Sequence, residues 1–406
     1  MSAFSLTAQS ALFKTKFGKL SENAYNSANP LLGTIKKQYD FVGEDMKVAV
    51  PTYFAGGVGS GSLPTANPAS AVKATINAKR VYAVTEIERE ALKASSSDEG
   101  AFVEAMKWNV QKTVEAWNRN ASRIMFGDGT GALGVTTAAD FVDVTGTTFA
   151  VGDTASAVIT SASWVEGHWE EGDYVNVGTA ADVLEIISVT PSTRTIVFEK
   201  ISGTTDFTAA AAGTSKTIYM QNSKDADPEG LKGVLDATSS TKYGVSIARR
   251  FQATQIAAGG AGISTDIMNE LISKIMYKCG KAPKMIVTSY TQMRKIKNFL
   301  EDQKVYMIDP RASELKGKIS WSGIEYMANG AKLAIIEDRM CPDDRMYAIN
   351  PDFITSYHRP GFGWFDDDGT VFLRQTNSDA YGARYGGYYQ NYIIPSFHGA
   401  VTGLAT

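Results

Sequence analysis

Three short stretches of the sequence carry residue types that could do chemistry. "FGDGTGALGV" (126–135) places four glycines and one aspartate in ten residues, a composition found in loops whose backbone N–H groups hold phosphate. "WFDDDGTVFL" (364–373) contains three consecutive aspartates that could hold a cation. "HWEEGD" (168–173) offers one histidine and three acids, and paired carboxylates can act as general acid and base.

The position of the glycine-rich stretch argues against phosphate binding. A phosphate loop leads into a helix, so that the positive end of the helix dipole faces the anion. Here the stretch follows the end of a long predicted helix, where the dipole is negative, and it lacks the Gly-Lys-Ser/Thr ending of a nucleotide loop. The sequence therefore predicts a joint after that helix, with Gly127 as the helix stop.

The two acidic stretches are better explained as turns. A calcium loop alternates its acids so that they converge on one ion, whereas Asp366, Asp367 and Asp368 are consecutive and lie between two strand-like runs. Asp-Gly between strands favours a hairpin turn, with loose cation binding as the alternative. His168, Glu170, Glu171 and Asp173 have no second group of residues to complete a site, which favours a solvated turn.

The remaining candidates give no reactive arrangement. The three histidines (His168, His358 and His398) are scattered, so the sequence offers no Ser-His-Asp or Cys-His set. Cys279 and Cys341 lack metal-ligand spacing, and we expect both to be reduced and buried. We therefore predict no catalytic, cofactor-binding or metal-binding residue and no enzymatic activity, with an enzyme whose site is unrecognised as the alternative.

Length and composition set broad limits. The chain has 406 residues, 44% of them hydrophobic, and a net charge of −3, which suits two or three domains with a sizeable core. The near-neutral charge argues against a dedicated nucleic-acid binder. The sequence shows no apolar run of about 18 residues and no secretory signal at its start, so we expect no membrane span and synthesis in the cytoplasm.

The first half of the chain divides into three predicted segments. Residues 1–46 resemble an arm with two short helices, the second capped by Asn29 with Pro30 in its first turn. Residues 47–90 alternate around a Gly-, Pro- and Ser-rich centre and predict a long β-hairpin. Residues 91–137 hold the clearest helix, 98–126, which begins with a capping box at Ser96 and Glu99 and is roughly 40 Å long. Its apolar residues recur every three or four positions.

Two further segments follow. Residues 138–226 contain few Lys or Arg and several short alternating runs, which predict an all-β insert, either a small sandwich or a barrel. Residues 227–406 predict an α+β domain. Its first helix, in "STDIMNELISKIMYKCG", should place Ile267, Leu271, Ile275 and Cys279 on one face. A second helix begins with a capping box at Ser289 and Gln292.

The aromatic C-terminal stretch "RYGGYYQNYIIPSF" allows two interpretations. Its rings could stack on nucleic-acid bases, but Arg384 is its only charged residue. We therefore expect a packed strand.

The order of these parts resembles the major capsid proteins of tailed bacteriophages, which have the Hong Kong 97 fold. "ASRIMFGDGTGALGV" looks like the end of that family's spine helix, and "NPLLGTIKKQYDFVGEDMKVAVPTY" looks like its N-arm running into the extended loop. "GSLPTANPASAVKATINAKRVYAVTEIERE" looks like the loop's return. "APKMIVTSYTQMRKI" and "GAKLAIIEDRMCPDDRMYAINPDFI" look like axial and peripheral elements. The resemblance leaves out 138–226, which departs from the minimal pattern.

The resemblance implies a structural subunit that assembles with itself, as hexamers and pentamers, into an icosahedral shell. It implies a portal partner, possible scaffolding and decoration proteins, loose non-specific contact with packaged double-stranded DNA, location in the virion and assembly in the host cytoplasm. Lys73 and Lys79 lie on the return strand, but nothing else here matches the lysine–asparagine crosslink of some relatives. The alternatives are a cellular nanocompartment shell of the same fold and a phage tail or adhesion protein whose β-domain binds carbohydrate.

Overall fold

The computed structural model describes most of the chain in two compact units. The described residues are 30–53, 61, 70–89, 99–137, 142–143, 149–178, 182–204, 215–236, 241–246, 251–302, 324–328, 330–366, 369–375 and 378–406. Unit 1 comprises Met1–Gly129, Ala226–Gly230 and Ile354–Tyr392, and unit 2 comprises Thr130–Asp225, Leu231–Phe353 and Ile393–Thr406. The fold is α+β, as the sequence predicts.

Unit 1 is built on one long helix. Helix α4 (Glu99–Phe126) packs against strand β4 (Lys79–Glu88), which confirms the predicted 98–126 helix; Ser96 of its predicted capping box lies outside the described residues. The buried face of α4 includes the predicted apolar positions Val110, Val114, Trp117, Ala121 and Ile124. This burial explains why the helix is stable, because helices gain most of their stability from packing an apolar face.

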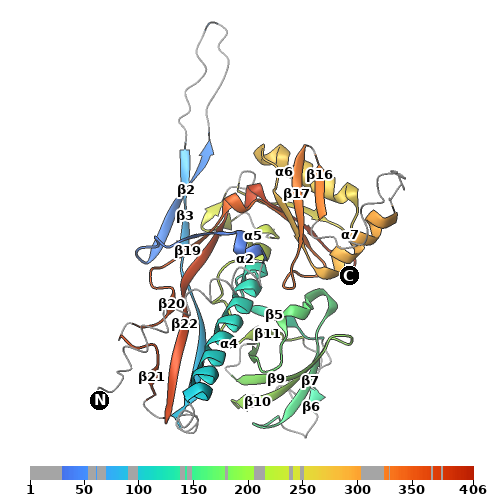
Figure 1. Ribbon diagram of the computed structural model, residues 1–406. Coiled ribbons are helices and arrows are strands. Elements are labelled where there is room, and N and C mark those ends of the chain that lie inside the picture. Colours follow the sequence, from blue (N-terminus) through green and yellow to red (C-terminus); the bar gives the residue numbers. More distant parts are fainter. Residues whose placement is uncertain are drawn as a thin grey trace, which may run out of the picture. The chain divides into compact units, whose positions relative to one another are not determined.

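The helix covers a sheet centred on the longest strand of unit 1. Strand β22 (Ala380–Ile393) pairs along its length with β4 (Figure 1). The remaining strands of this sheet are β1 (Lys36–Gln38), β19 (Ile354–His358), β20 (Gly363–Trp364) and β21 (Leu373–Arg374). Trp117 lies edge-on to Tyr385 and Tyr389, with ring centroids 5.7 and 6.2 Å away. These contacts support the packed-strand interpretation of the aromatic stretch.

The second predicted arm helix is present and short. Helix α2 spans Pro30–Thr34, so Pro30 lies in its first turn as predicted, and the chain then enters β1, which pairs in parallel with β19. This pairing joins residues more than 300 positions apart, so no local sequence pattern predicts it. Asn29 and the first predicted arm helix lie outside the described residues.

In unit 2 the first seven strands form one antiparallel sheet. Its order is β5 (Ala132–Val135), β11 (Thr217–Met220), β8 (Tyr174–Val177), β9 (Val183–Thr190), β10 (Thr195–Ser202), β7 (Thr154–Val158) and β6 (Val142–Asp143). Fully buried Leu184, Ile186, Ile196 and Phe198 lie in its core. The sheet begins with β5, six residues before the predicted boundary at 138, because β5 pairs with β11.

A second sheet completes unit 2. Its order is β14 (Thr254–Ala257), β23 (Gly399–Thr402), β18 (Met346–Ile349), β15 (Met285–Thr288), β17 (Ala331–Glu337) and β16 (Ile324–Ala328). Helices α6 (Thr265–Cys279) and α7 (Tyr290–Asp302) contribute to its core. The small elements α5 (Leu231–Leu235), β12 (Thr241–Lys242) and β13 (Val245–Ser246) precede this sheet in the chain.

The two helices of unit 2 agree in part with the predicted buried face and the predicted cap. On α6, Leu271 and Ile275 are fully buried, while Ile267 and Cys279 are only partly buried at the edge of that core. Ser289 accepts the backbone N–H of Gln292, as a cap should. The reciprocal half of the predicted capping box is not formed by Gln292, because its side-chain amide instead donates to the carbonyls of Asp343 and Ala405.

Candidate assembly surfaces

The predicted hairpin stands apart from the sheet of unit 1. Strands β2 (Asp45–Tyr53) and β3 (Ser70–Asn77) pair with each other, and among the described residues they join no other sheet (Figure 1). Ala74 and Ile76 near the base are fully buried, whereas Val72 is 40% exposed. A two-stranded hairpin is marginally stable in water on its own. Its outer half therefore has faces that can be covered by another chain.

The base of the hairpin is fixed to the rest of unit 1. Arg359 donates to the carbonyl of Gly43 at 2.8 Å and lies over the ring of Phe41, which is 1% exposed. A stacked arginine that also makes a hydrogen bond holds its partner more firmly than a simple charge contact. The hairpin thus extends from an anchored root.

The end of the spine helix is held by a buried ion pair. Arg123 donates to Asp227 at 2.7 Å and to the side-chain oxygen of Asn120 at 2.9 Å. In the ion pair, the side chain of Arg123 is 5% exposed and that of Asp227 is 8% exposed. Asp227 belongs to the short segment Ala226–Gly230, and Asn391 of β22 donates to the carbonyl of Glu229 at 3.0 Å. This segment therefore ties the helix end to the central strand.

Gly230 is required by the same close packing. A Cβ at this position would lie 2.2 Å from the carbonyl oxygen of Ile124 and 2.5 Å from that of Met125. We expect Gly230→Ala to lower the free energy of unfolding by about 1–3 kcal/mol, the cost of overpacking, in a chemical denaturation experiment. The control is Gly262→Ala, where nothing lies within 4 Å of an added Cβ. Equal effects of the two substitutions would contradict the tight contact.

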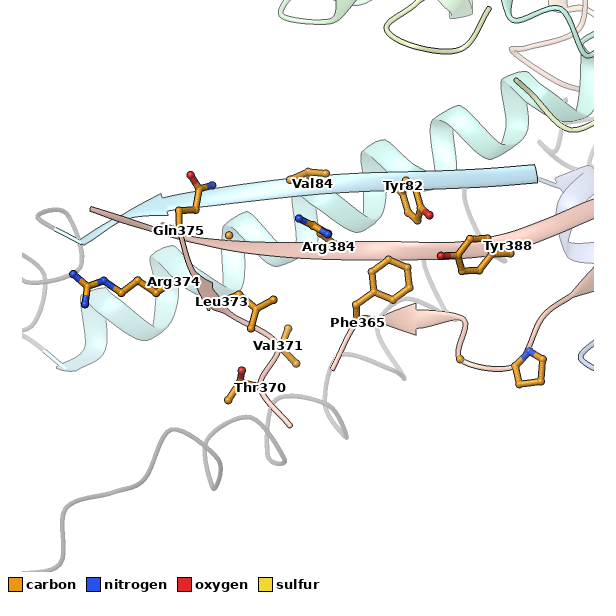
Figure 2. A pocket seen from close by; sticks show the side chains of 13 residues that line it. Tyr82, Val84, Phe365, Thr370, Val371, Leu373, Arg374, Gln375, Arg384 and Tyr388 are labelled. Atoms are coloured by element: carbon orange, nitrogen blue, oxygen red, sulfur yellow. The ribbon is translucent and has the colours of Figure 1, made fainter. Parts of the chain in front are cut away.

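A groove lies over the sheet of unit 1, with a volume of about 880 Å³. Figure 2 shows Tyr82 and Val84 of β4, Arg384 and Tyr388 of β22 and Leu373 of β21 around it. On β4 the buried residue Val81 alternates with exposed Tyr82 and Val84, so these two side chains point to the face opposite Val81. The groove thus presents apolar, aromatic and positively charged groups together.

The aromatic wall of the groove is neutral. Tyr82 lies edge-on to Phe365 and to Tyr388, with centroid distances of 5.6 and 6.1 Å. Burial and then the hydrogen bond with Tyr388 raise the pKa of Tyr82 to about 12. The charge of the groove therefore comes from its arginines. Arg374 and Arg384 form no ion pair with a carboxylate within the described part of the chain.

Two histidines are buried and held neutral. His398 is fully buried, its Nδ1 accepts the backbone N–H of Asn350 at 3.1 Å, and burial lowers its pKa to about 3. His358 stacks on Tyr389 with centroids 5.1 Å apart, and burial lowers its pKa to about 4. Both residues fill packed interiors, and His358 Nε2 also lies 3.0 Å from the hydroxyl of Ser356.

These histidines predict a pH dependence of stability. Because the unfolded chain binds protons near pH 6.5 and the folded chain does not, stability falls as the pH drops from about 6.5 towards 4. We expect His398→Gln to reduce this slope by up to about 1.4 kcal/mol per pH unit between pH 6 and 5. Urea titrations at several pH values measure the slope of the unfolding free energy against pH. A slope in the His398→Gln variant equal to that of the wild type would contradict the prediction.

The stretches with apparent chemistry lie in turns and joints. The glycine-rich stretch leaves α4 at Gly127 and enters β5, so it joins the two units. Gly369 donates its N–H to the carbonyl of Asp366 at 2.7 Å, so a turn forms there, while Asp367 and Asp368 lie outside the described residues. The predicted hairpin was wrong, because β20 and β21 each pair with β22 and not with each other. Glu170 and Glu171 are exposed in a turn. His168 contacts the carbonyl of Leu133 through Nδ1 at 3.2 Å.

The described residues offer little for other kinds of site. In the described ranges, no set of three His, Cys, Asp or Glu side chains is placed to hold a metal ion. The helices described there include none with the length and apolarity needed to cross a membrane. Both cysteines are free; Cys341 is buried, whereas Cys279 is only partly so.

Comparison with known proteins agrees with the architecture. Residues 205–362 match the family described as SU10 major capsid protein. The capsid asymmetric unit of cyanophage A-1(L) superposes with a TM-score of 0.53 at 10% identity, covering 93% of each chain. The chain has the Hong Kong 97 capsid fold. Together with the match of residues 205–362 to a major capsid protein family, this fold supports a role as a capsid shell subunit.

Other solved structures are similar at lower TM-scores. The encapsulin of Synechococcus elongatus gives a TM-score of 0.45 at 5% identity over 93% of this chain and 89% of that one. Mycobacterium phage Bobi gives 0.44 at 8% identity, over 93% and 90%. A search of curated protein sequences finds no match. Because these sequence identities are low, the contacts of the subunit follow from its own residues.

Proposed function

We propose that this capsid subunit builds an icosahedral shell of hexamers and pentamers by giving its arm and hairpin to neighbouring copies. The single observation that supports this most strongly is the β2–β3 hairpin, which is anchored at Phe41 and Arg359 but joins no other sheet among the described residues. An isolated pair of strands gains stability when another surface covers it. Neighbouring copies are the surface that a shell provides.

The finer parts of the proposal rest on the resemblance to tailed-phage capsids. A portal protein, a scaffolding protein and a decoration protein are the expected further partners, and double-stranded DNA is the expected content of the shell. The near-neutral charge of the chain suits a container that touches DNA loosely. We propose location in the virion, assembly in the host cytoplasm and a purely structural role.

Residues 138–226 are proposed as an insert on the outer side of the shell. They contain twelve acidic and four basic residues, a net charge of −8 within a chain of −3 overall. Like charges repel, so an acidic domain is more stable away from packaged DNA. The remainder of the chain then carries a net charge of +5.

Sedimentation velocity of the purified protein at rising concentration tests self-assembly. We expect a monomer or capsomer boundary at low concentration and a second, much faster boundary above a threshold, because shell assembly is cooperative. The nanocompartment alternative also gives fast particles, but those particles would not take up DNA. A single slow boundary under every condition would contradict the proposal.

A further inference from the structure

The groove of unit 1 and the seven-stranded sheet of unit 2 carry opposite charges beside exposed apolar side chains. In the groove, Val84 is 67% exposed and Leu373 is 42% exposed, next to Arg374 and Arg384. Exposed apolar side chains gathered in a concave surface mark a place that another surface covers. Gly382 also lines the groove and has no side chain to fill it.

The charge of the groove indicates what covers it. Arg374 and Arg384 have no carboxylate partner among the described residues, and arginine pairs most strongly with carboxylates or phosphates in bidentate geometry. The neutral rings of Tyr82 and Phe365 beside them add area for apolar contact. An acidic protein surface with apolar side chains satisfies both features, whereas the DNA backbone satisfies only the charge.

The seven-stranded sheet of unit 2 presents such an acidic face. Glu185 of β9 lies directly opposite Glu199 of β10, and Tyr174 of β8 lies opposite Glu185. Neither glutamate forms an ion pair within the described part of the chain. Like charges directly opposite each other across two strands are destabilising, so this arrangement gains from positive charge supplied from outside. Tyr174, Ile187 and Ile201 are 39–43% exposed around it.

We propose that the acidic sheet face around Glu185 and Glu199 of one copy docks into the arginine-lined groove of the next copy. This rests on the proposed self-assembly. The contact joins two different surfaces of the same chain, and such head-to-tail contacts close into rings when the rotation permits. A ring of copies joined in this way is a hexamer or a pentamer of the shell.

Two charge-reversed variants test the contact. Groove variant Arg374→Glu/Arg384→Glu and sheet variant Glu185→Arg/Glu199→Arg each place like charges against each other. We expect each alone to raise the protein concentration needed for assembly by about tenfold or more, with unchanged circular dichroism. The control, Arg294→Glu/Lys332→Glu, changes two exposed residues by the same charge as the groove variant and should assemble as the wild type does.

Mixing the two variants gives the decisive result. In an equimolar mixture, a ring can alternate the two variants. Each altered groove then meets an altered sheet, and each native groove meets a native sheet. Assembly should therefore return in such alternating rings. Such rings have an even number of copies, which native mass spectrometry resolves. A single chain carrying all four substitutions should also assemble.

Three results would overturn the proposal. Rescue by the fourfold variant without rescue by the mixture would place the contact within one chain. Normal shells from the groove variant that hold less DNA would assign the groove to packaged DNA. Normal assembly and packaging by both single variants would remove the contact altogether. Failure of the wild-type protein itself to assemble would instead contradict the proposed function.

Discussion

Replacing residues 54–69 with Asn-Gly should abolish shell assembly and leave the subunit folded. Tyr53 and Ser70 are paired in the hairpin, so a two-residue Asn-Gly turn can close the strands directly. The substitution removes the outer part of the element proposed to reach neighbouring copies while it keeps the root at Phe41 and Arg359. Sedimentation velocity should show subunits without the fast boundary, and circular dichroism should match the intact protein.

The control shortens a different loop. Residues 205–214 connect β10 to β11 in unit 2, and a Gly-Ser linker in their place should leave the proposed assembly contacts intact. If the hairpin variant still forms closed shells, the hairpin has no essential role between copies. If both variants fail, the loss reflects loop shortening in general.

Breaking the buried Arg123–Asp227 pair should give the largest loss of stability in unit 1. Asp227→Asn leaves a guanidinium that is 5% exposed without its counter-charge, and an uncompensated buried charge costs about 3–5 kcal/mol. Chemical denaturation measures the change. Asp45→Asn is the control, because its pair with Lys47 is well exposed and such pairs contribute about 0–1 kcal/mol. Similar losses of unfolding free energy in both variants would show that the buried pair stabilises the fold no more than the exposed one.

The predicted elements that proved accurate have strong local signals. Helix α4 follows from apolar residues at steps of three and four. The order of the elements supported the resemblance to capsid proteins, and the observed fold confirms it. Helix α2 is short, as expected, whereas the pairing of the following strand β1 with β19 could not be found from any local pattern.

The candidate surfaces were predictable only in part. The hairpin was predictable because apolar and polar residues alternate on either side of a glycine-rich centre. The ion pair of Arg123 with Asp227 links residues 104 positions apart, so their partnership required the fold. The groove was missed because its lining comes from β4, β21, β22 and from residues on either side of β20, among them Pro360, Phe365 and Val371. One signal was available in the sequence, namely the net charge of −8 in residues 138–226.

Electron microscopy of the purified, assembled protein tests the central claim most directly, namely that this chain is the subunit of a closed icosahedral shell. We expect closed polyhedral particles of uniform size, whose averaged images show five-fold and six-fold clusters of subunits with hairpins lying across neighbouring copies. Tubes, or discrete small oligomers under every assembly condition, would contradict it.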